Sequence, residues 1–197
     1  MKTLVIATKN SGKLSEFKQM LEGLPYRILS LADFPPIEIH EDGSSFDENA
    51  LIKAKTVAAQ TGFAALGDDS GLEVKALAGM PGIYTARYAG EDASDRDNIE
   101  KLLSEMKNIP WQRRQARFVC SLALVFPDDG FFIERGFCEG MIATAPRGEH
   151  GFGYDPIFYL PQFDKTMAEL TDQEKNRISH RALAVRKMKM HLIKEQV

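Results

Sequence analysis

The loop at residues 8–13, TKNSGK, combines the residue types that bind phosphate groups. Its members are Thr8, Lys9, Asn10, Ser11, Gly12 and Lys13. The hydroxyl and amide side chains can donate hydrogen bonds, the lysines supply positive charge, and the N-terminus of a following helix adds about half a positive charge. The loop is not a Walker A motif, because Ala7 and Leu14 stand where GxxxxGK[ST] requires a glycine and a hydroxyl. It is a candidate phosphate site of another kind, and the same residues also fit a surface turn with a capped helix.

Acidic residues in two stretches could hold a divalent cation. Glu41 precedes a predicted helix, and Asp68 and Asp69 lie where an apolar strand is expected to meet a turn at Gly71. Strand ends are where α/β proteins place ligands, and Mg²⁺ takes one or two carboxylates together with water and substrate phosphates. The pair Glu41 and Asp69 would suit it. Each acid alone also fits a solvated loop residue, but two adjacent carboxylates after a buried strand need a cation or hydrogen-bond donors.

Asn49 and Lys53 lie on one stripe of the helix predicted from residue 46. With Phe46 and Ala50 they follow the spacing i, i+3, i+4 and i+7. Lys53 could reach a phosphate oxygen or the carboxylates. The alternative is a solvated lysine on an amphipathic helix.

Two later stretches could bind a flat ring. In GFGYDP, glycines flank Phe152, so that a ring could stack on it while Asp155 reads ring N–H groups. In EKNRISHRALA, Arg181 offers a planar fork of donors beside Lys175 and His180. A turn with a core phenylalanine and a capping or structural histidine are the alternatives.

Hydrophobic periodicity predicts the elements that must position these residues. They are a strand at 3–7, a helix at 12–22, an extended segment at 26–31, a helix from 46 to about 62, a strand at 63–67, a short helix within 78–90, a helix at 95–107, strands at 116–126 and 131–144, a strand in 153–161 that starts with Asp155, and a helix at 180–195. Capping boxes are predicted for Ser45 with Glu48 and for Thr171 with Glu174, and PDDG at 127–130 favours a hairpin.

This order of elements predicts an α/β fold with a mixed sheet and flanking helices. No linker-like stretch divides the chain, so residues 1–197 are expected to form one folding unit with a cleft. The net charge of −3 argues against broad nucleic-acid binding. Cys120 and Cys138 stand outside any metal-binding array, and no apolar run is long enough for a signal peptide or a membrane span, so a reduced, cytoplasmic protein is expected.

Six ordered blocks of the chain resemble a known family. TKNSGK, SFDENALIKA, DDSGLEV, PGIYTARYAG, GFGYDPIF and ISHRA are similar to motifs of the inosine triphosphate pyrophosphatases, the dITP/XTP diphosphatases that remove non-standard purine nucleotides. The resemblance covers residues 3 to about 190. It implies an elongated α/β fold with two lobes around a central cleft, and a homodimer.

The resemblance also implies roles for single residues. The triphosphate would bind at residues 8–13 with Lys53 beside it, and Ser70 would touch the substrate; Asn49, on the Lys53 stripe, is a further candidate for substrate binding. Mg²⁺ would bind Glu41 and Asp69, and Asp69 would also be the general base. Lys13, with Lys53 and the metal, would offset charge on the departing pyrophosphate, and its partners are expected to be the acids at 41 and 69. The base pocket would comprise Phe152, Gly153, Tyr154 and Asp155, closed by Lys175, His180 and Arg181.

The implied reaction is hydrolysis of dITP, ITP or XTP between the α and β phosphates. A 6-oxo purine offers a carbonyl to donors such as Arg181, whereas adenine offers an amino group. The competing interpretations are a Maf-like nucleotide pyrophosphatase, whose arginine-rich loop is missing from TKNSGK, and a non-catalytic nucleotide sensor.

Overall fold

The computed structural model describes residues 2–128 and 130–194. The strands are β1 Lys2–Ala7, β2 Tyr26–Ser30, β3 Ala64–Val74, β4 Gln115–Val125, β5 Phe131–Ile142, β6 Phe158–Leu160 and β7 Lys165–Thr166. The α-helices are α1 Ser11–Met20, α2 Phe46–Thr61, α3 Asp95–Glu105, α4 Asp172–Ile178 and α5 His180–Lys194. Short 3-10 helices are η1 Leu31–Asp33, η2 Lys75–Leu77, η3 Gly82–Arg87, η4 Trp111–Arg113, η5 Asp155–Ile157 and η6 Met167–Glu169. Among the described residues, no helix is long and apolar enough to cross a membrane.

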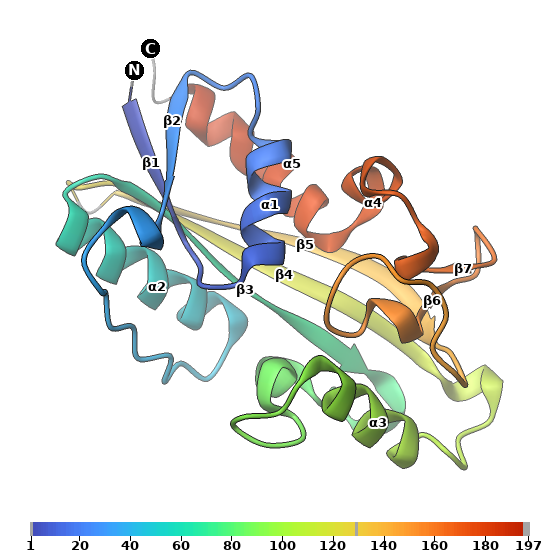
Figure 1. Ribbon diagram of the computed structural model, residues 1–197. Coiled ribbons are helices and arrows are strands. Elements are labelled where there is room, and N and C mark those ends of the chain that lie inside the picture. Colours follow the sequence, from blue (N-terminus) through green and yellow to red (C-terminus); the bar gives the residue numbers. More distant parts are fainter. Residues whose placement is uncertain (1, 129, 195–197) are drawn as a thin grey trace. The chain divides into compact units, whose positions relative to one another are not determined.

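The strands form one mixed sheet in the order β2-β1-β3-β4-β5-β6-β7 (Figure 1). Strand β1 pairs in parallel with β2 and β3, whereas β6 pairs antiparallel with β5 and β7. The predicted α/β class with a mixed sheet and flanking helices is confirmed.

The chain divides into two compact units that share strands β3, β4 and β5. Unit 1 comprises residues 1–69, 120–136 and 181–197, and unit 2 comprises residues 70–119 and 137–180. That the whole chain folds as one unit stays a prediction.

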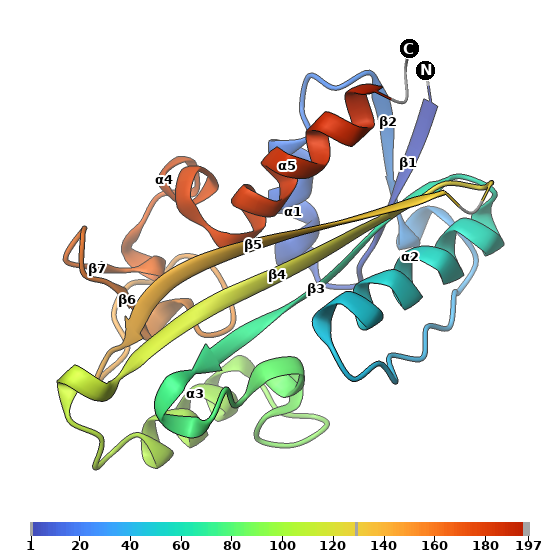
Figure 2. The same ribbon diagram turned by 180° about the vertical axis from the view of Figure 1, so that it is seen from behind.

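Unit 1 has helices on both faces of its strands, α1 and α5 on one face and α2 on the other (Figures 1 and 2). Alternation along β3 decides which side chain meets which helix layer. Leu66 packs in the cluster with residues of α1 and α5, whereas Ala65 packs with α2. Neighbouring β4 repeats the pattern with Leu122 and Ala123.

Unit 2 has a separate core that joins α3 to the strands. Leu72 of β3, Leu102 of α3 and Phe158 of β6 are fully buried in it. Gly140 of β5 allows this packing, because a Cβ there would lie 2.7 Å from the Phe158 ring.

Most predicted elements are confirmed, with shifts of a few residues at their ends. Helix α2 has Ser45 as its N-cap and ends at Gly62, which has a positive φ of 71°. Thr171 and Glu174 form the predicted capping box at α4. At α2 only half of the predicted box forms, because the Glu48 carboxylate accepts from Ser44 rather than from Ser45.

Two predicted boundaries are wrong. Strand β3 continues through Gly71 to Val74, so no turn follows Asp69. Asp155 begins 3-10 helix η5 instead of a strand, because Pro156 has a fixed φ and no N–H to donate to a ladder. Residue 129 of the predicted hairpin PDDG and residue 195 of the last predicted helix lie outside the described residues.

Candidate active site

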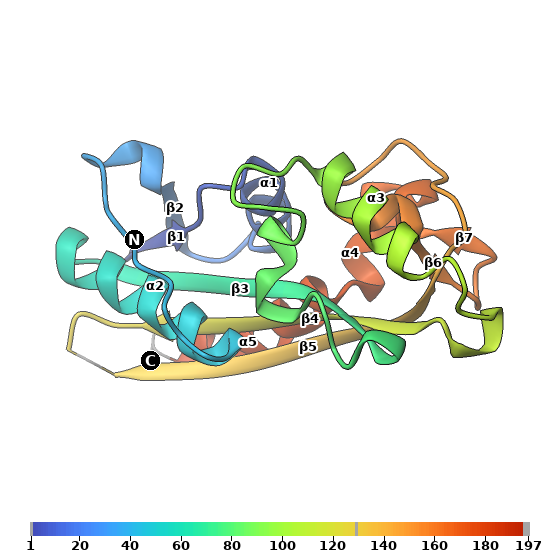
Figure 3. The same ribbon diagram turned by 90° about the horizontal axis from the view of Figure 1, so that it is seen from below.

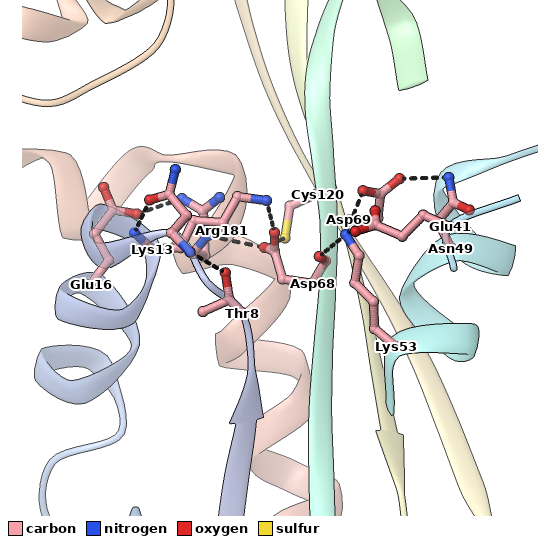
Figure 4. A network of polar contacts seen from close by, with 11 residues as sticks. Thr8, Lys13, Glu16, Glu41, Asn49, Lys53, Asp68, Asp69, Cys120 and Arg181 are labelled. Atoms are coloured by element: carbon pink, nitrogen blue, oxygen red, sulfur yellow. Dashed lines mark hydrogen bonds and ion pairs between the residues drawn. The ribbon is translucent and has the colours of Figure 1, made fainter. Parts of the chain in front are cut away.

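Asp68 and Asp69 point to opposite faces of β3 within unit 1 (Figure 4). Successive side chains of a strand alternate, so Asp68 continues the row of Leu66 and Asp69 continues the row of Ala65. Asp68 therefore meets residues of α1 and α5, whereas Asp69 meets residues of α2. The two adjacent acids thus belong to two different polar clusters, one with α1 and α5 and one with α2.

Asp68 is a buried acceptor for two cations. Its side chain, in a residue only 1% exposed, pairs with the Lys13 ammonium and accepts from Arg181 Nε at 3.0 Å and from Cys120 Sγ at 3.2 Å. Arg181 is also 1% exposed, and its Nη1 donates to Glu16 Oε2 at 2.5 Å. Burial disfavours the Asp68 carboxylate, but Arg181 and Lys13 outweigh it and hold the Asp68 pKa well below its usual range.

Asp69 and Glu41 converge on the Lys53 ammonium. Lys53 Nζ lies 2.9 Å from Asp69 Oδ1, 2.6 Å from Glu41 Oε2 and 3.0 Å from the Asp68 carbonyl oxygen. Asn49 Nδ2 donates to the other Asp69 oxygen at 3.3 Å. Burial disfavours a charged Lys53, but the carboxylates of Asp69 and Glu41 outweigh burial and raise the Lys53 pKa. For Asp69 burial prevails over Lys53 and raises the pKa of the carboxyl.

The close packing of α2 on β3 brings Lys53 to Asp69. A Cβ at Gly67 would lie 2.2 Å from the Ala50 carbonyl oxygen and 2.9 Å from the Ala54 nitrogen, so only glycine fits between strand and helix. The α2 face at this contact consists of small alanines, which shortens the distance from helix to strand. Long side chains on α2 can then span to the Asp69 carboxylate.

The predicted phosphate loop opens helix α1. Asn10 is the N-cap, and its side-chain oxygen accepts from the Lys13 nitrogen at 2.9 Å. The Thr8 hydroxyl accepts from the Asn10 nitrogen at 3.2 Å. Lys9 is exposed, and Ser11 and Gly12 lie in the first helical turn. Their backbone N–H groups belong to the end of the helix that favours anions.

In unit 2, Asp155 and Lys175 form a buried ion pair beside Phe152. Lys175 Nζ lies 2.6 Å from Asp155 Oδ2 and 4.7 Å from the centroid of the Phe152 ring. The Phe152 nitrogen donates to the same Asp155 oxygen at 3.0 Å. Carboxylate, ammonium and aromatic ring therefore lie together, and their role as a base pocket stays a prediction.

The other predicted base-pocket residues have different contacts. The Tyr154 hydroxyl donates to the Thr85 carbonyl at 3.0 Å, and burial raises the Tyr154 pKa. The His180 ring stacks on Phe118 with centroids 4.8 Å apart. Arg181, the next residue, belongs to unit 1 and directs Nε and Nη1 to the buried carboxylates already described. Ser70 follows Asp69 on β3.

Comparison with known proteins assigns the chain to a family, because its sequence matches the Ham1 family over residues 4–191. The chain is a member of the Ham1 family. It is 52% identical over 189 residues to a protein of Halalkalibacterium halodurans named dITP/XTP pyrophosphatase, covering 95% of this chain and 97% of the relative. A Bacillus subtilis protein of the same name is also 52% identical over 189 residues, covering 95% and 96%. The resemblance inferred from the six sequence blocks is thus confirmed.

Solved structures of the Ham1 family share the fold. A HAM1 protein from Coxiella burnetii has a TM-score of 0.90 and 44% identity, covering 98% of this chain and 100% of that one. The Ham1 protein of Staphylococcus aureus has a TM-score of 0.88 at 44% identity, with the same coverage.

One predicted pairing is wrong, and three partners were missed. The ion-pair partner of Lys13 is Asp68, whereas Glu41 and Asp69 pair with Lys53. For Asp68 the sequence predicted only that it and Asp69 together need a cation or hydrogen-bond donors. The partners missed from the sequence are Glu16, Cys120 and Asp95. The position of Glu16 three residues after Lys13 on one helix could have revealed it, but nothing local marks Cys120 or Asp95.

The Asp69 and Glu41 carboxylates fit a hard cation, because both already converge on a positive charge, the Lys53 ammonium. Residues 2–128 and 130–194 contain no group of three or more His, Cys, Asp or Glu side chains arranged for a metal. Mg²⁺ commonly binds through one or two carboxylates and takes its remaining ligands from water and phosphate. The donor set therefore fits Mg²⁺ bound together with a nucleotide.

Proposed function

We propose that this Ham1-family protein hydrolyses dITP, ITP and XTP to the nucleoside monophosphate and pyrophosphate. The observation that carries the proposal is the buried Asp69 carboxyl with a raised pKa, held between Asn49 and the Lys53 ammonium with Glu41 beside it. A carboxylate with a raised pKa is a better proton acceptor than an ordinary one, and the adjoining cation can stabilise a phosphate. The relatives named dITP/XTP pyrophosphatase support the choice of substrate.

Asp69 acts as the general base. It takes a proton from a water molecule, the water oxygen bonds to the α-phosphorus, and the bond from that phosphorus to the oxygen bridging to the β-phosphorus breaks. The electron pair of that bond leaves with pyrophosphate. Lys53 and Lys13 place positive charge near the departing group, and the first turn of α1 adds N–H donors.

Glu41 and Asp69 would hold Mg²⁺, which when bound supplies Lewis-acid stabilisation of the phosphate oxygens. Lys53 pairs with both carboxylates, so its ammonium lies beside the residues that would hold the metal and could also contact substrate oxygens. Ser70 and Asn49 complete the proposed substrate contacts on this side.

Unit 2 binds the purine in this proposal. The base stacks on Phe152, and Gly153, Tyr154 and Asp155 provide the loop around it. Lys175 and His180 are the candidate readers of the 6-oxo group on this unit, because a donor satisfied by a carbonyl is left unpaired opposite the amino group of adenine. Arg181 of unit 1, whose Nε and Nη1 donate to Asp68 and Glu16, is a candidate by the family resemblance alone. The family resemblance supports a homodimer that acts on free nucleotides. Cysteine usage and the lack of an apolar run long enough for a signal peptide support the cytoplasm as its location.

Product analysis tests the proposal. Purified protein with ITP and Mg²⁺ should release pyrophosphate and IMP in equal amounts, and ATP should react far more slowly. Release of orthophosphate and IDP would overturn the cleavage position, and equal rates on ATP and ITP would overturn the substrate choice. Binding of ITP without turnover would favour a nucleotide sensor.

Asp69→Asn tests the base directly. Turnover of ITP should fall by roughly 100-fold or more, the usual effect of losing a positioned proton acceptor. Asp47→Asn is a matched control, because Asp47 is an acid on α2 that bonds Ser121 and Arg135 instead of the proposed substrate. Near-normal turnover in Asp69→Asn, at unchanged melting temperature, would contradict the assignment.

A further inference from the structure

The loop at residues 151–155, here called the base loop, is held through two consecutive peptide N–H groups. The Phe152 nitrogen donates to Asp155 Oδ2 at 3.0 Å, and the Gly153 nitrogen donates to Asp95 Oδ2 at 2.7 Å. Gly151 and Gly153 have positive φ angles of 80° and 58°. A backbone held in conformations that only glycine adopts easily depends on such bonds to keep a single shape.

Asp95 is available for this bond because other residues cap its helix. Ser94 and Asp97 form a reciprocal capping box at α3: the Asp97 nitrogen donates to Ser94 Oγ at 3.2 Å, and the Ser94 nitrogen donates to Asp97 Oδ2 at 2.8 Å. The carboxylate of Asp95, between them in sequence, instead reaches the base loop. Figure 3 shows α3 beside the orange segment that contains Gly153.

Helix α3 is itself firmly attached within unit 2. Asn98 is 2% exposed, accepts from the Ala89 nitrogen at 2.8 Å and donates to the Ala86 carbonyl at 3.1 Å. Ala86 lies in η3 and Ala89 follows it, and the Thr85 carbonyl of η3 accepts from Tyr154 of the base loop. Asp95 therefore connects the loop to a helix that buried hydrogen bonds hold in place.

We propose that Asp95 is a positioning residue that sets selectivity for 6-oxo purines by fixing the base loop. The inference rests on the proposed function. Phe152 lies 4.7 Å from the Lys175 ammonium, and Asp155 pairs with the same ammonium. Without the Asp95 bond the Gly153 peptide can rotate, which moves the Phe152 ring relative to Lys175. A base that stacks on this ring then no longer meets the polar groups at one fixed distance.

Two substitutions separate the hydrogen bond from the helix. Asp95→Ala removes the acceptor, whereas Asp95→Asn retains an amide oxygen in its place. Asp97→Ala is the control, since it weakens the cap of the same helix without touching Gly153. Each variant is assayed for kcat/KM with ITP and with ATP, for affinity for IMP by calorimetry, and for melting temperature.

Asp95→Ala should lower the ratio of kcat/KM for ITP to that for ATP by about fivefold, the usual net worth of one hydrogen bond, because the bond from Gly153 to Asp95 is exposed to solvent. IMP affinity should fall in parallel, while Asp95→Asn stays within about twofold of the original protein. An unchanged ratio in Asp95→Ala, or an equal loss in Asp97→Ala, would overturn the inference. If the unaltered protein fails to release pyrophosphate from ITP, the proposed function fails, whereas the loss of IMP affinity in Asp95→Ala still tests the loop.

Discussion

Replacing Asp68 by Asn should strongly destabilise unit 1. The Asp68 side chain is fully buried and accepts from Lys13, Arg181 and Cys120. An asparagine preserves the shape but removes the counter-charge of two cations, and it turns an NH₂ group toward donors. Breaking a buried ion pair by removing one partner costs about 3 to 5 kcal/mol of unfolding free energy. At about 2 to 4 °C per kcal/mol for a chain of this size, the melting temperature should fall by roughly 6 to 20 °C.

Thermal unfolding followed by circular dichroism measures this shift, with the exposed acid variant Asp92→Asn as control. The double variant Asp68→Asn with Lys13→Met should be more stable than Asp68→Asn alone, because it removes the Lys13 charge, whereas Arg181 still pairs with Glu16. A fall of less than about 2 °C in Asp68→Asn would refute the account of Asp68 as the counter-charge that holds Lys13 and Arg181 together.

Two further substitutions test packing and charge elsewhere in unit 1. Gly67→Ala should cost about 1 to 3 kcal/mol of unfolding free energy and reduce turnover of ITP, because its Cβ would meet the Ala50 carbonyl oxygen at 2.2 Å and push α2 outward; urea denaturation with unchanged stability would contradict this close contact. Arg135→Ala should raise the Asp47 pKa, since the hydrogen bond from Arg135 is the main cause that lowers it. A carboxyl whose pKa is lowered in the folded state stabilises the fold at pH values above its ordinary pKa of 3.8, and this stabilisation is lost as the pH falls. Arg135→Ala should therefore cost under about 1 kcal/mol of unfolding free energy at pH 7 and less at pH 3. An unchanged Asp47 pKa in a carboxyl NMR titration would rule this out.

The sequence predicted the elements well where periodicity and capping agree. Helices α2 and α3 begin at residues 46 and 95 as predicted, and the shared stripe of Asn49 and Lys53 indeed faces Asp69. The prediction of a turn at Gly71 was wrong. Charged residues are unusual inside a buried strand, so Asp68 and Asp69 suggested that the strand had ended. Here each carboxylate is neutralised by cations from the helix layer it faces, so β3 continues.

Partners separated by long stretches of chain could not be predicted. The bond from Arg181 to Asp68 spans 113 positions, and the bond from Gly153 to Asp95 spans 58. No local spacing rule connects such residues. For Lys13 the sequence correctly predicted an acidic partner but not which acid. The choice between Asp68 and Asp69 depends on which face of β3 each carboxylate occupies.

The opposite orientation of Asp68 and Asp69 constrains how the gene can change. The β3 segment before Asp68 pairs with β1 from Ala64 onward. Deleting or inserting one residue in this segment would turn each of the two acids toward the opposite helix layer. A deletion would put Asp69 in the place of Asp68 and leave Lys53 without its carboxylate on β3, whereas an insertion would put Asp68 in the place of Asp69 and leave Lys13 without its counter-ion, although every functional side chain remained encoded. Substitutions in this segment can reduce stability or activity by small steps, whereas selection should eliminate changes in its length.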